Sequence, residues 1–92
     1  MIKSFKCKET EKIFNRRFSK KLPQTIQRTA LKKLNIIDVS DTLSILKIPS
    51  SNRLESLKGK REGQYSIRIN DQWRICFKWN NGAIDVEIED YH

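Results

Sequence analysis

The second half of the chain alternates apolar and polar residues over three successive stretches, and this pattern limits the possible folds more than any other feature. Residues 65–69, 73–79 and 84–89 each place an apolar side chain at every second position. Such alternation predicts strands with one buried and one exposed face. Asn81-Gly82, between the last two stretches, is a strong signal for a tight hairpin, and a turn near Asn70-Asp71 joins the first two. The chain is therefore predicted to end in an antiparallel meander.

The first half of the chain follows a helical period instead. Residues 8 to about 18 are predicted to form a helix with Phe14 and Phe18 stacked on one face. A second helix is predicted after Pro23, because proline fits the first helical turn. Its apolar stripe consists of Ile26, Ala30, Leu31, Leu34 and Ile37. The smaller predicted elements are a strand, a helical turn, a loop and a further strand, at residues 2–6, 41–47, 49–52 and 53–57.

Together these elements predict one α+β domain spanning residues 1–92. Its N-terminal strand is followed by two helices, which pack on one face of a mainly antiparallel sheet. Because 92 residues can bury only a modest core, a shallow surface site is expected rather than a deep pocket. The Trp, Ile, Phe and Val positions of the strands should form the core beneath the helices. The charged residues expected on the opposite face are Arg68, Arg74, Lys78, Asp85, Glu87 and Glu89.

Basic residues concentrate near the N-terminus of a chain whose formal net charge is +8. Residues 1–33 contain 11 of the 19 Lys and Arg and only 2 acidic residues, a charge of +9. The remainder has 8 basic and 9 acidic residues, a charge of −1. A basic half of this kind favours a nucleic acid or an acidic protein segment as partner. A solvated helical surface that keeps a small protein in solution has the same composition.

Cysteine usage and hydropathy indicate the cellular compartment in which the protein is expected to fold. Cys7 and Cys76 are far apart and form no CxxC motif, and residues 1–6 lack the apolar run of a signal peptide. These features favour the reducing cytoplasm. No apolar stretch approaches the roughly 18 residues that span a bilayer, so no membrane partner is expected. One histidine and two separated cysteines argue against a zinc site within one chain, and no cofactor is predicted.

The side chains best suited to chemistry lie at the C-terminus, where the last predicted strand runs directly into Asp90-Tyr91-His92. His92 is the only histidine and can act as a general acid or base near neutral pH. Tyr91 offers a ring for base stacking and a phenol that can donate a proton. Asp90 can orient the imidazole or pair with an arginine. The alternative interpretation is a polar tail with an incidental histidine.

Cations that suit phosphate binding lie upstream of that tip. The segment 53–63 holds four basic residues and two glycines that permit close backbone approach, although it can equally be a solvated turn. Arg68 and Arg74 can each bind a phosphate through a planar guanidinium or pair with a cross-strand carboxylate. Metal-free RNA cleavage needs such cations, an acid–base group and a stacking ring. The 2′-hydroxyl must lose a proton, the phosphorane needs positive charge, and the leaving 5′-oxygen must gain a proton.

Two segments carry a resemblance to a known family: NRLESLKGKREGQYSIRINDQWRICF at residues 52–77 and VEIEDYH at residues 86–92. With the opening MIKSF, they resemble the HigB group of the RelE/ParE toxin superfamily over essentially the whole chain. The resemblance implies a RelE-like fold and a toxin of a type II toxin–antitoxin module. It implies a ribosome-dependent endoribonuclease that cuts mRNA in the 30S A site without a metal. It also implies a HigA-type helix-turn-helix antitoxin, whose complex with the toxin binds operator DNA.

The resemblance also implies roles for individual residues. The catalytic set carried over by position is Lys58, Arg74, Asp90, Tyr91 and His92. His92 is implied as the general acid or base, Arg74 and Lys58 as a phosphate clamp, and Tyr91 as the residue that stacks on or orients the nucleotide. The further residues expected to bind RNA are Arg53, Lys60, Arg61 and Arg68.

Glu55 departs from the family pattern, because one branch has a second histidine at this position. A carboxylate there could act as base toward the 2′-hydroxyl, although its usual pKa near 4.3 suits neutral pH poorly, or it could take no part. Two alternatives to the nuclease stay open. One is a toxin of the same fold that poisons gyrase, and the other is a basic RNA-binding module. The terminal Asp-Tyr-His with Arg74 favours the nuclease, since a gyrase poison needs no histidine.

Overall fold

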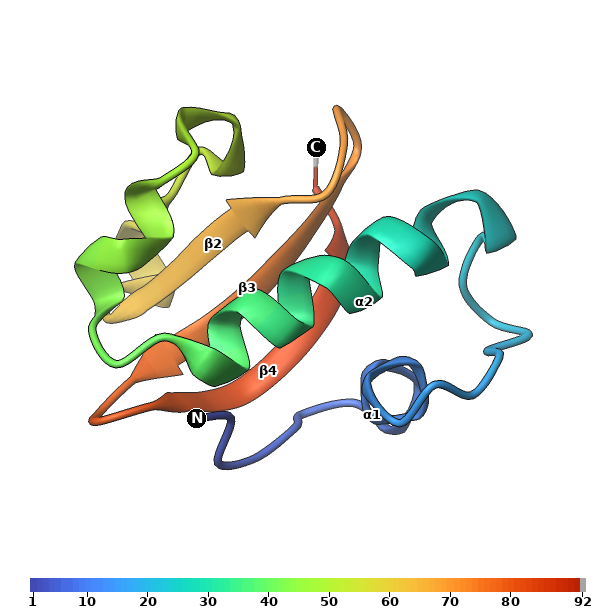
Figure 1. Cartoon of the computed structure of the whole chain (residues 1–92). Coiled ribbons are helices and arrows are strands. Elements are labelled where there is room, and N and C mark those ends of the chain that lie inside the picture. Colours follow the sequence, from blue (N-terminus) through green and yellow to red (C-terminus); the bar gives the residue numbers. More distant parts are fainter. Residues whose placement is uncertain (92) are drawn as a thin grey trace.

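The computed structural model describes residues 1–91 and contains two α-helices and a four-stranded sheet (Figure 1). The helices are α1 (Lys8–Phe14) and α2 (Gln24–Val39), and the short 3₁₀ helices are η1 (Leu43–Lys47), η2 (Ser50–Asn52) and η3 (Gly59–Arg61). The strands are β1 (Glu55–Ser56), β2 (Gln64–Arg68), β3 (Trp73–Trp79) and β4 (Ala83–Asp90). They pair antiparallel in the order β1-β2-β3-β4. The predicted α+β class and the antiparallel meander are confirmed.

Helix α2 lies across one face of the sheet, and α1 lies beside β4 (Figure 1). The α2 residues that enter the core are Ile26, Ala30, Leu34 and Ile37, each at most 3% exposed. The strand residues that meet them include Ile67, Ile75, Phe77, Val86 and Ile88. This interface is the core that the helical stripe and the strand alternation predict, because each element buries its apolar face against the other.

Helix α1 is shorter than predicted. It ends at Phe14, and Phe18, which was expected to share its apolar face, is 60% exposed. The chain leaves the helix at Arg16, whose φ of 63° is left-handed. Ser19 is then held by the Gln27 side chain, which accepts from its backbone N–H at 3.1 Å and donates to its carbonyl at 2.7 Å. Hydrogen bonds to α2 therefore replace the last predicted turn of α1.

The N-terminal segment runs parallel to β4, as two isolated bridges rather than a continuous strand. Ile2 pairs with Ala83 and Phe5 with Val86. Gly82 accommodates this approach, because a Cβ at this position would lie 2.7 Å from the Met1 carbonyl oxygen. The strand predicted at residues 2–6 is therefore correct in location but interrupted.

A β-bulge in β4 explains that interruption and corrects one core prediction. The β3–β4 register shifts between Cys76 and Lys78, and Asp85 has a left-handed φ of 55°. The Asp85 backbone N–H donates to the Ser4 hydroxyl at 2.9 Å. The extra residue reverses the alternation at the start of β4. Ala83 is therefore buried, while Ile84, predicted as core, lies opposite Lys78 on the other face.

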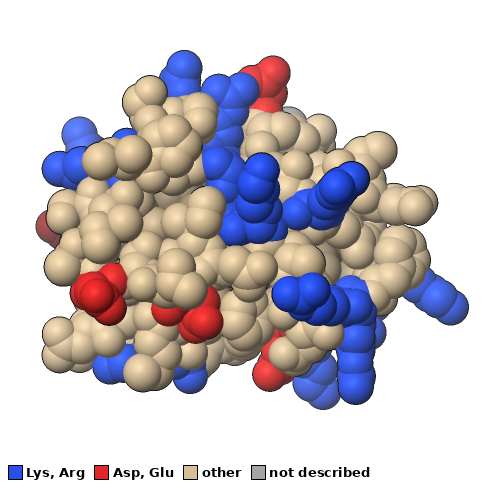
Figure 2. All heavy atoms as spheres, in the orientation of Figure 1, with Lys and Arg blue, Asp and Glu red and all other residues tan. Residues whose placement is uncertain are grey.

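Surface charge follows the uneven sequence distribution. In Figure 2 the Lys and Arg side chains gather over α2 and α1, on the face turned toward the viewer in Figure 1. Asp and Glu side chains are fewer on this face and lie mostly below and to the left of that group. Among residues 1–91, no helix combines the length and hydropathy needed to cross a membrane.

Candidate RNA-processing site

The sheet face turned away from α2, called the outer face here, collects the predicted charged residues. In the strand register, Arg74 lies between Arg68 on β2 and Glu89 on β4, and Cys76 lies opposite Glu87. Directly opposed residues point to the same side of a sheet. Lys78 also pairs with Asp85, with Nζ 3.7 Å from Oδ2. The expected charged outer face is therefore confirmed.

Arg74 is the most constrained cation on this face, with a side chain only 12% exposed. Its Nη1 donates to the Arg53 carbonyl oxygen and to the Ser66 hydroxyl, each at 3.2 Å. Its Nη2 donates to Glu55 Oε1 at 3.2 Å, forming an ion pair. These contacts account for three of the five N–H donors of a guanidinium. Arg74 is therefore held in position by β1, β2 and the Arg53 carbonyl. The N–H donors that these contacts do not use remain for a ligand.

Tyr91 completes this group from the C-terminal end of β4. Its backbone N–H donates to the Gln72 carbonyl oxygen at 2.6 Å, which extends the β3–β4 pairing by one residue. The Arg74 guanidinium carbon lies 5.0 Å from the centre of the Tyr91 ring, within range of a cation–π contact. We call Arg74, Glu55, Ser66, Tyr91 and the Arg53 carbonyl the Arg74 site.

Asp90 and His92 are the other two residues of the predicted C-terminal triad. Asp90 lies opposite Trp73 in the register, so it shares the α2-facing side of the sheet and not the side of Arg74. The Gln72 side-chain amide donates to Asp90 Oδ2 at 3.1 Å. His92 lies outside the described residues. The structure thus brings Tyr91 to Arg74, and it does not bring Asp90 there.

Arg61, expected to bind RNA, is engaged with protein groups on the outer face. Its Nη2 lies 2.8 Å from Glu89 Oε2 and donates to Gln64 Oε1 at 3.0 Å. Burial raises the pKa of the Glu89 carboxyl, but the neighbouring Cys76 thiol and Arg61 guanidinium outweigh burial and leave that pKa below its usual value. Arg61 therefore fixes η3 over β4.

The Cys76 thiol and the Glu87 carboxyl lie in the same cluster, and their pKa values are raised rather than lowered. Burial, followed by the neighbouring Glu89 carboxylate, raises the pKa of the Cys76 thiol to about 12. The same two causes raise the pKa of Glu87. The outer face beside the Arg74 site is thus a tightly packed network of charges.

The remaining predicted cations occupy the rim of the sheet. Lys58 and Lys60 are exposed at the beginning and middle of the η3 segment. Lys58 borders a hollow of about 630 Å³ that Tyr65 and Gly63 also line. The side chains of Lys58 and Arg74 both carry only hydrogen-bond donors, so a bound phosphate rather than a direct contact would join them. The clamp of these two cations stays a prediction.

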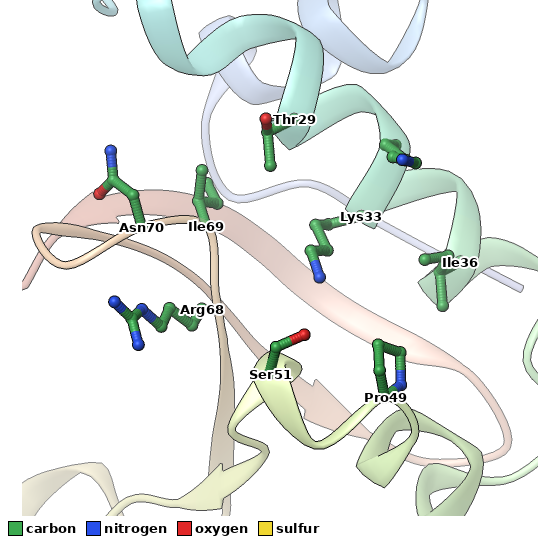
Figure 3. Close-up of a pocket in the computed structure, with 9 residues that line it drawn as sticks. Thr29, Lys33, Ile36, Pro49, Ser51, Arg68, Ile69 and Asn70 are labelled. Carbon is green, nitrogen blue, oxygen red and sulfur yellow. The ribbon is translucent and has the colours of Figure 1, made fainter.

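Arg53 and Arg68, also expected to bind RNA, both lie beside Arg74. Arg53 has a left-handed φ of 48°, which turns its carbonyl oxygen toward Arg74. Arg68 extends from β2 to the side away from Lys33 (Figure 3) and forms an ion pair with Asp71. Its position opposite Arg74 makes it a second cation on the same face.

Two contributions to the Arg74 site were not predicted: the Ser66 hydroxyl, and the backbone carbonyl of Arg53, whose side chain was expected to bind RNA. Ser66 lies at an outer-face position of the β2 alternation, so the period of two could have identified it. The Arg53 carbonyl depends on a left-handed backbone at a non-glycine residue, for which the sequence has no signal. Among residues 1–91, no group of three His, Cys, Asp or Glu side chains is arranged to hold a metal ion.

The geometry suits the binding of an anionic ester next to a flat ring. A guanidinium can offer two parallel N–H donors to phosphate oxygens, and its fixed orientation spares the cost of ordering it during binding. The Tyr91 ring lies beside this guanidinium and can stack on a base. Glu55 is held where a carboxylate can approach the same ligand. Together these groups can contact a phosphate and an adjacent base.

Known proteins resemble this chain over most or all of its length. A family model described as the RelE-like toxin of type II toxin-antitoxin system HigB matches residues 3–92. "Toxin HigB-1" of Vibrio cholerae serotype O1 is 40% identical over 62 residues, which cover 67% of this chain and 65% of that protein. "Endoribonuclease HigB" of Proteus vulgaris is 36% identical over 93 residues, covering 100% of both chains. The chain therefore belongs to the HigB-like family of RelE-like toxins from type II toxin–antitoxin systems.

Proposed function

We propose that this protein is an endoribonuclease that cuts mRNA in the 30S A site of the ribosome, by acid–base catalysis without a metal. The observation that supports it most is the constrained Arg74, held by three protein acceptors beside the Tyr91 ring. The full-length similarity to a relative named as an endoribonuclease points the same way. A ribosomal target implies a cytoplasmic location.

The proposed reaction assigns one task to each group. The 2′-hydroxyl oxygen attacks the adjacent phosphorus after losing its proton to a base, the O2′–P bond forms, and the P–O5′ bond breaks as O5′ gains a proton. Arg74 stabilises the additional negative charge on the phosphorane. Tyr91 stacks on or orients the nucleotide, His92 acts as general acid or base, and Lys58 assists phosphate binding. Asp90 orients the imidazole of His92.

The products themselves test this chemistry. Attack by the 2′-hydroxyl leaves a 5′-hydroxyl end and a 2′,3′-cyclic phosphate, whereas attack by water would leave no cyclic phosphate. We expect end mapping of messages translated by purified ribosomes to show 5′-hydroxyl ends. A 2′-deoxy nucleotide at the cut position should abolish the cut. Cleavage that survives this substitution would contradict the proposed reaction.

Glu55 has two possible tasks in this reaction. It can act as the base toward the 2′-hydroxyl, or it can serve only to hold Arg74 through their 3.2 Å ion pair. Glu55→Gln keeps an acceptor for Arg74 but removes the base, so a large loss of cleavage would favour the first task. Glu55→His introduces a base with a pKa closer to neutrality. A less toxic Glu55→His variant would count against a base at this position.

A gyrase poison and a simple RNA-binding module remain the alternatives. His92→Gln should abolish growth arrest if the C-terminal residues are catalytic. Toxicity that persists after removal of Tyr91 and His92 would favour either alternative, and a gyrase supercoiling assay would distinguish them.

A toxin of a type II system is paired with an antitoxin protein. We propose a helix-turn-helix partner of the HigA type, whose complex with the toxin binds operator DNA. The basic segment from Lys3 to Lys33 is the proposed contact for ribosomal RNA or for an acidic stretch of that antitoxin. Ribosome association should weaken as salt rises, and a flat salt response would contradict a phosphate-dominated contact.

A further inference from the structure

A hollow of about 720 Å³ lies between α2, η2 and the end of β2, on the α2 side of the molecule (Figure 3). Its polar lining consists of Thr29, Lys32, Lys33, Ser51, Arg68 and Asn70. The α2 contributors recur at helical spacing, so they form a second stripe beside the one that packs on the sheet. No acidic side chain among the described residues lines it. We call this hollow the Lys33 pocket.

Lys33 is fixed in this pocket by a buried neutral group. Its Nζ donates to Asn52 Oδ1. Asn52 is 0% exposed, and its Nδ2 donates to the carbonyl oxygens of Leu46 at 3.2 Å and Ile48 at 3.3 Å. The η1–η2 segment therefore holds the amide, and the amide holds the ammonium. An ammonium has three donors, so this contact leaves two for a ligand.

The positive charge in the pocket is not balanced by the protein. In residues 1–91, no carboxylate forms an ion pair with Lys32 or Lys33, whereas Arg68 pairs with the largely exposed Asp71. Burial, followed by repulsion from Lys32, lowers the pKa of Lys33. A partly desolvated cation with only a neutral partner gains from binding an anion, because the anion restores the lost stabilisation of its charge.

The groups around Lys33 suit a phosphate better than a carboxylate. Two ammonium groups, two hydroxyls and one amide are the side chains that commonly contact nucleic-acid phosphates. Lysine acts there as a point charge, whereas planar recognition of a carboxylate favours arginine. Arg68 links the pocket to the Arg74 site, because it borders the pocket and lies directly opposite Arg74 in the strand register.

We propose that the Lys33 pocket binds a backbone phosphate of RNA, at a point on the strand separate from the phosphate held by Arg74. Arg68 lies between the two positions and guides the strand around the end of β2. The proposal rests on the proposed function for the identity of the ligand as RNA. The shared chemistry is a phosphodiester, which either the message or ribosomal RNA can supply.

The variants remove charge from the pocket and are compared with a matched control. Lys32→Gln changes an exposed side chain that has no hydrogen bond or ion pair in residues 1–91, so its fold should be intact. Lys33→Met removes the fixed ammonium and leaves Asn52 without this partner, so its unfolding temperature must be measured as well. The two changes combined, Lys32→Gln/Lys33→Met, make the pocket double variant. Its control is the double variant Lys47→Gln/Lys78→Gln, which loses the same charge at exposed sites outside both the pocket and the basic segment from Lys3 to Lys33.

Binding is measured with a fluorescent single-stranded oligoribonucleotide and, separately, with 30S subunits, over a range of KCl concentrations. We expect the pocket double variant to lower the slope of log affinity against log salt by about 0.7 per lost contact with a single strand. A change with the oligonucleotide identifies the message as the source, and a change with 30S subunits alone identifies ribosomal RNA. Slopes equal to those of the control with both ligands would overturn the proposal, as would a loss confined to antitoxin binding.

A second measurement does not depend on cleavage. Inorganic phosphate added to the isotopically labelled protein should shift the backbone amide signals of Thr29, Lys33 and Ser51, and Lys33→Met should abolish these shifts. Absence of shifts in the unmodified protein would overturn the pocket. A protein that binds phosphate here and binds RNA, yet cuts no message, would refute the nuclease and leave the pocket standing.

Discussion

The Arg74 site and the Lys33 pocket differ in whether carboxylates of the protein balance their positive charge. At the Arg74 site the guanidinium is paired with Glu55, and its neighbour Arg61 is paired with Glu89. In the Lys33 pocket the fixed ammonium contacts only the neutral Asn52. An ion pair weakens the attraction of the cation for a distant polyanion. It also holds the donors of the cation in a defined geometry, which catalysis requires. Unbalanced charge strengthens attraction but defines orientation less. Under the two proposals, the Arg74 site serves the reaction and the Lys33 pocket serves affinity.

The largest expected effect comes from Arg74→Lys. Lysine keeps the charge but loses the planar donors that contact Arg53, Ser66 and Glu55, so we expect the cleavage rate at saturating ribosomes to fall by about 10²–10³. The pocket double variant should instead raise the ribosome concentration for half-maximal rate and leave the saturated rate nearly unchanged. Single-turnover cleavage over a ribosome titration measures both quantities. A reduced saturated rate in the pocket variant would remove the distinction.

Tyr91 should show the next largest effect. Tyr91→Ala removes the ring beside Arg74. The loss of one stacked base should lower cleavage by about tenfold to a hundredfold. Tyr91→Phe keeps the ring and its contact with the guanidinium, so a loss of less than about fivefold is expected. If the Phe variant is as defective as the Ala variant, the phenol and not the ring is what the reaction uses. Both variants are assayed as for Arg74→Lys.

The two regions should also respond to opposite ends of the pH scale. The lowered pKa of Glu89 means that its stabilisation is present above the usual carboxyl value of 4.5 and is lost as the pH falls through the lowered pKa. Glu89→Gln should therefore cost about 0.5–1 kcal/mol at pH 7, a modest amount because the pair with Arg61 is partly exposed. The difference from the unmodified protein should shrink toward pH 3. Urea unfolding from pH 3 to 7 measures it, and a constant difference would contradict this assignment.

Lys33 changes stability in the same direction with pH, but at the alkaline end of the scale. Its folded-state pKa is below the usual 10.5, so the unfolded chain binds the proton more tightly, and stability rises with pH between the lowered pKa and 10.5. Lys32→Gln removes the neighbouring charge and should raise stability at pH 7 by less than about 0.5 kcal/mol. The gain should diminish in high salt, which screens the repulsion. A destabilised Lys32→Gln variant would show that the lysines do not repel each other measurably.

Most of the architecture was predictable because it depends on periodicity. The α2 stripe and the alternation in β2 and β3 place their apolar side chains in one core, as predicted. The same alternation places Arg74 and Glu89 together on the outer face. It also separates Asp90 from Tyr91, a consequence that the resemblance to a family motif did not suggest. The end of α1 was not predictable, because the Gln27 contacts that replace its last turn come from another element.

The sequence by itself determined the class of fold, the surface charge and the side chains available for chemistry, because local periods and composition depend only on the order of residues. Tertiary structure alone decided which of those side chains meet. The bulge at Asp85 exchanges Ile84 for Ala83 in the core, and the left-handed Arg53 aims a carbonyl at Arg74. The buried Asn52 fixes Lys33 from a separate segment. Each arises where hydrogen bonds between distant segments outweigh local preference, since buried polar groups must find partners wherever the fold supplies them.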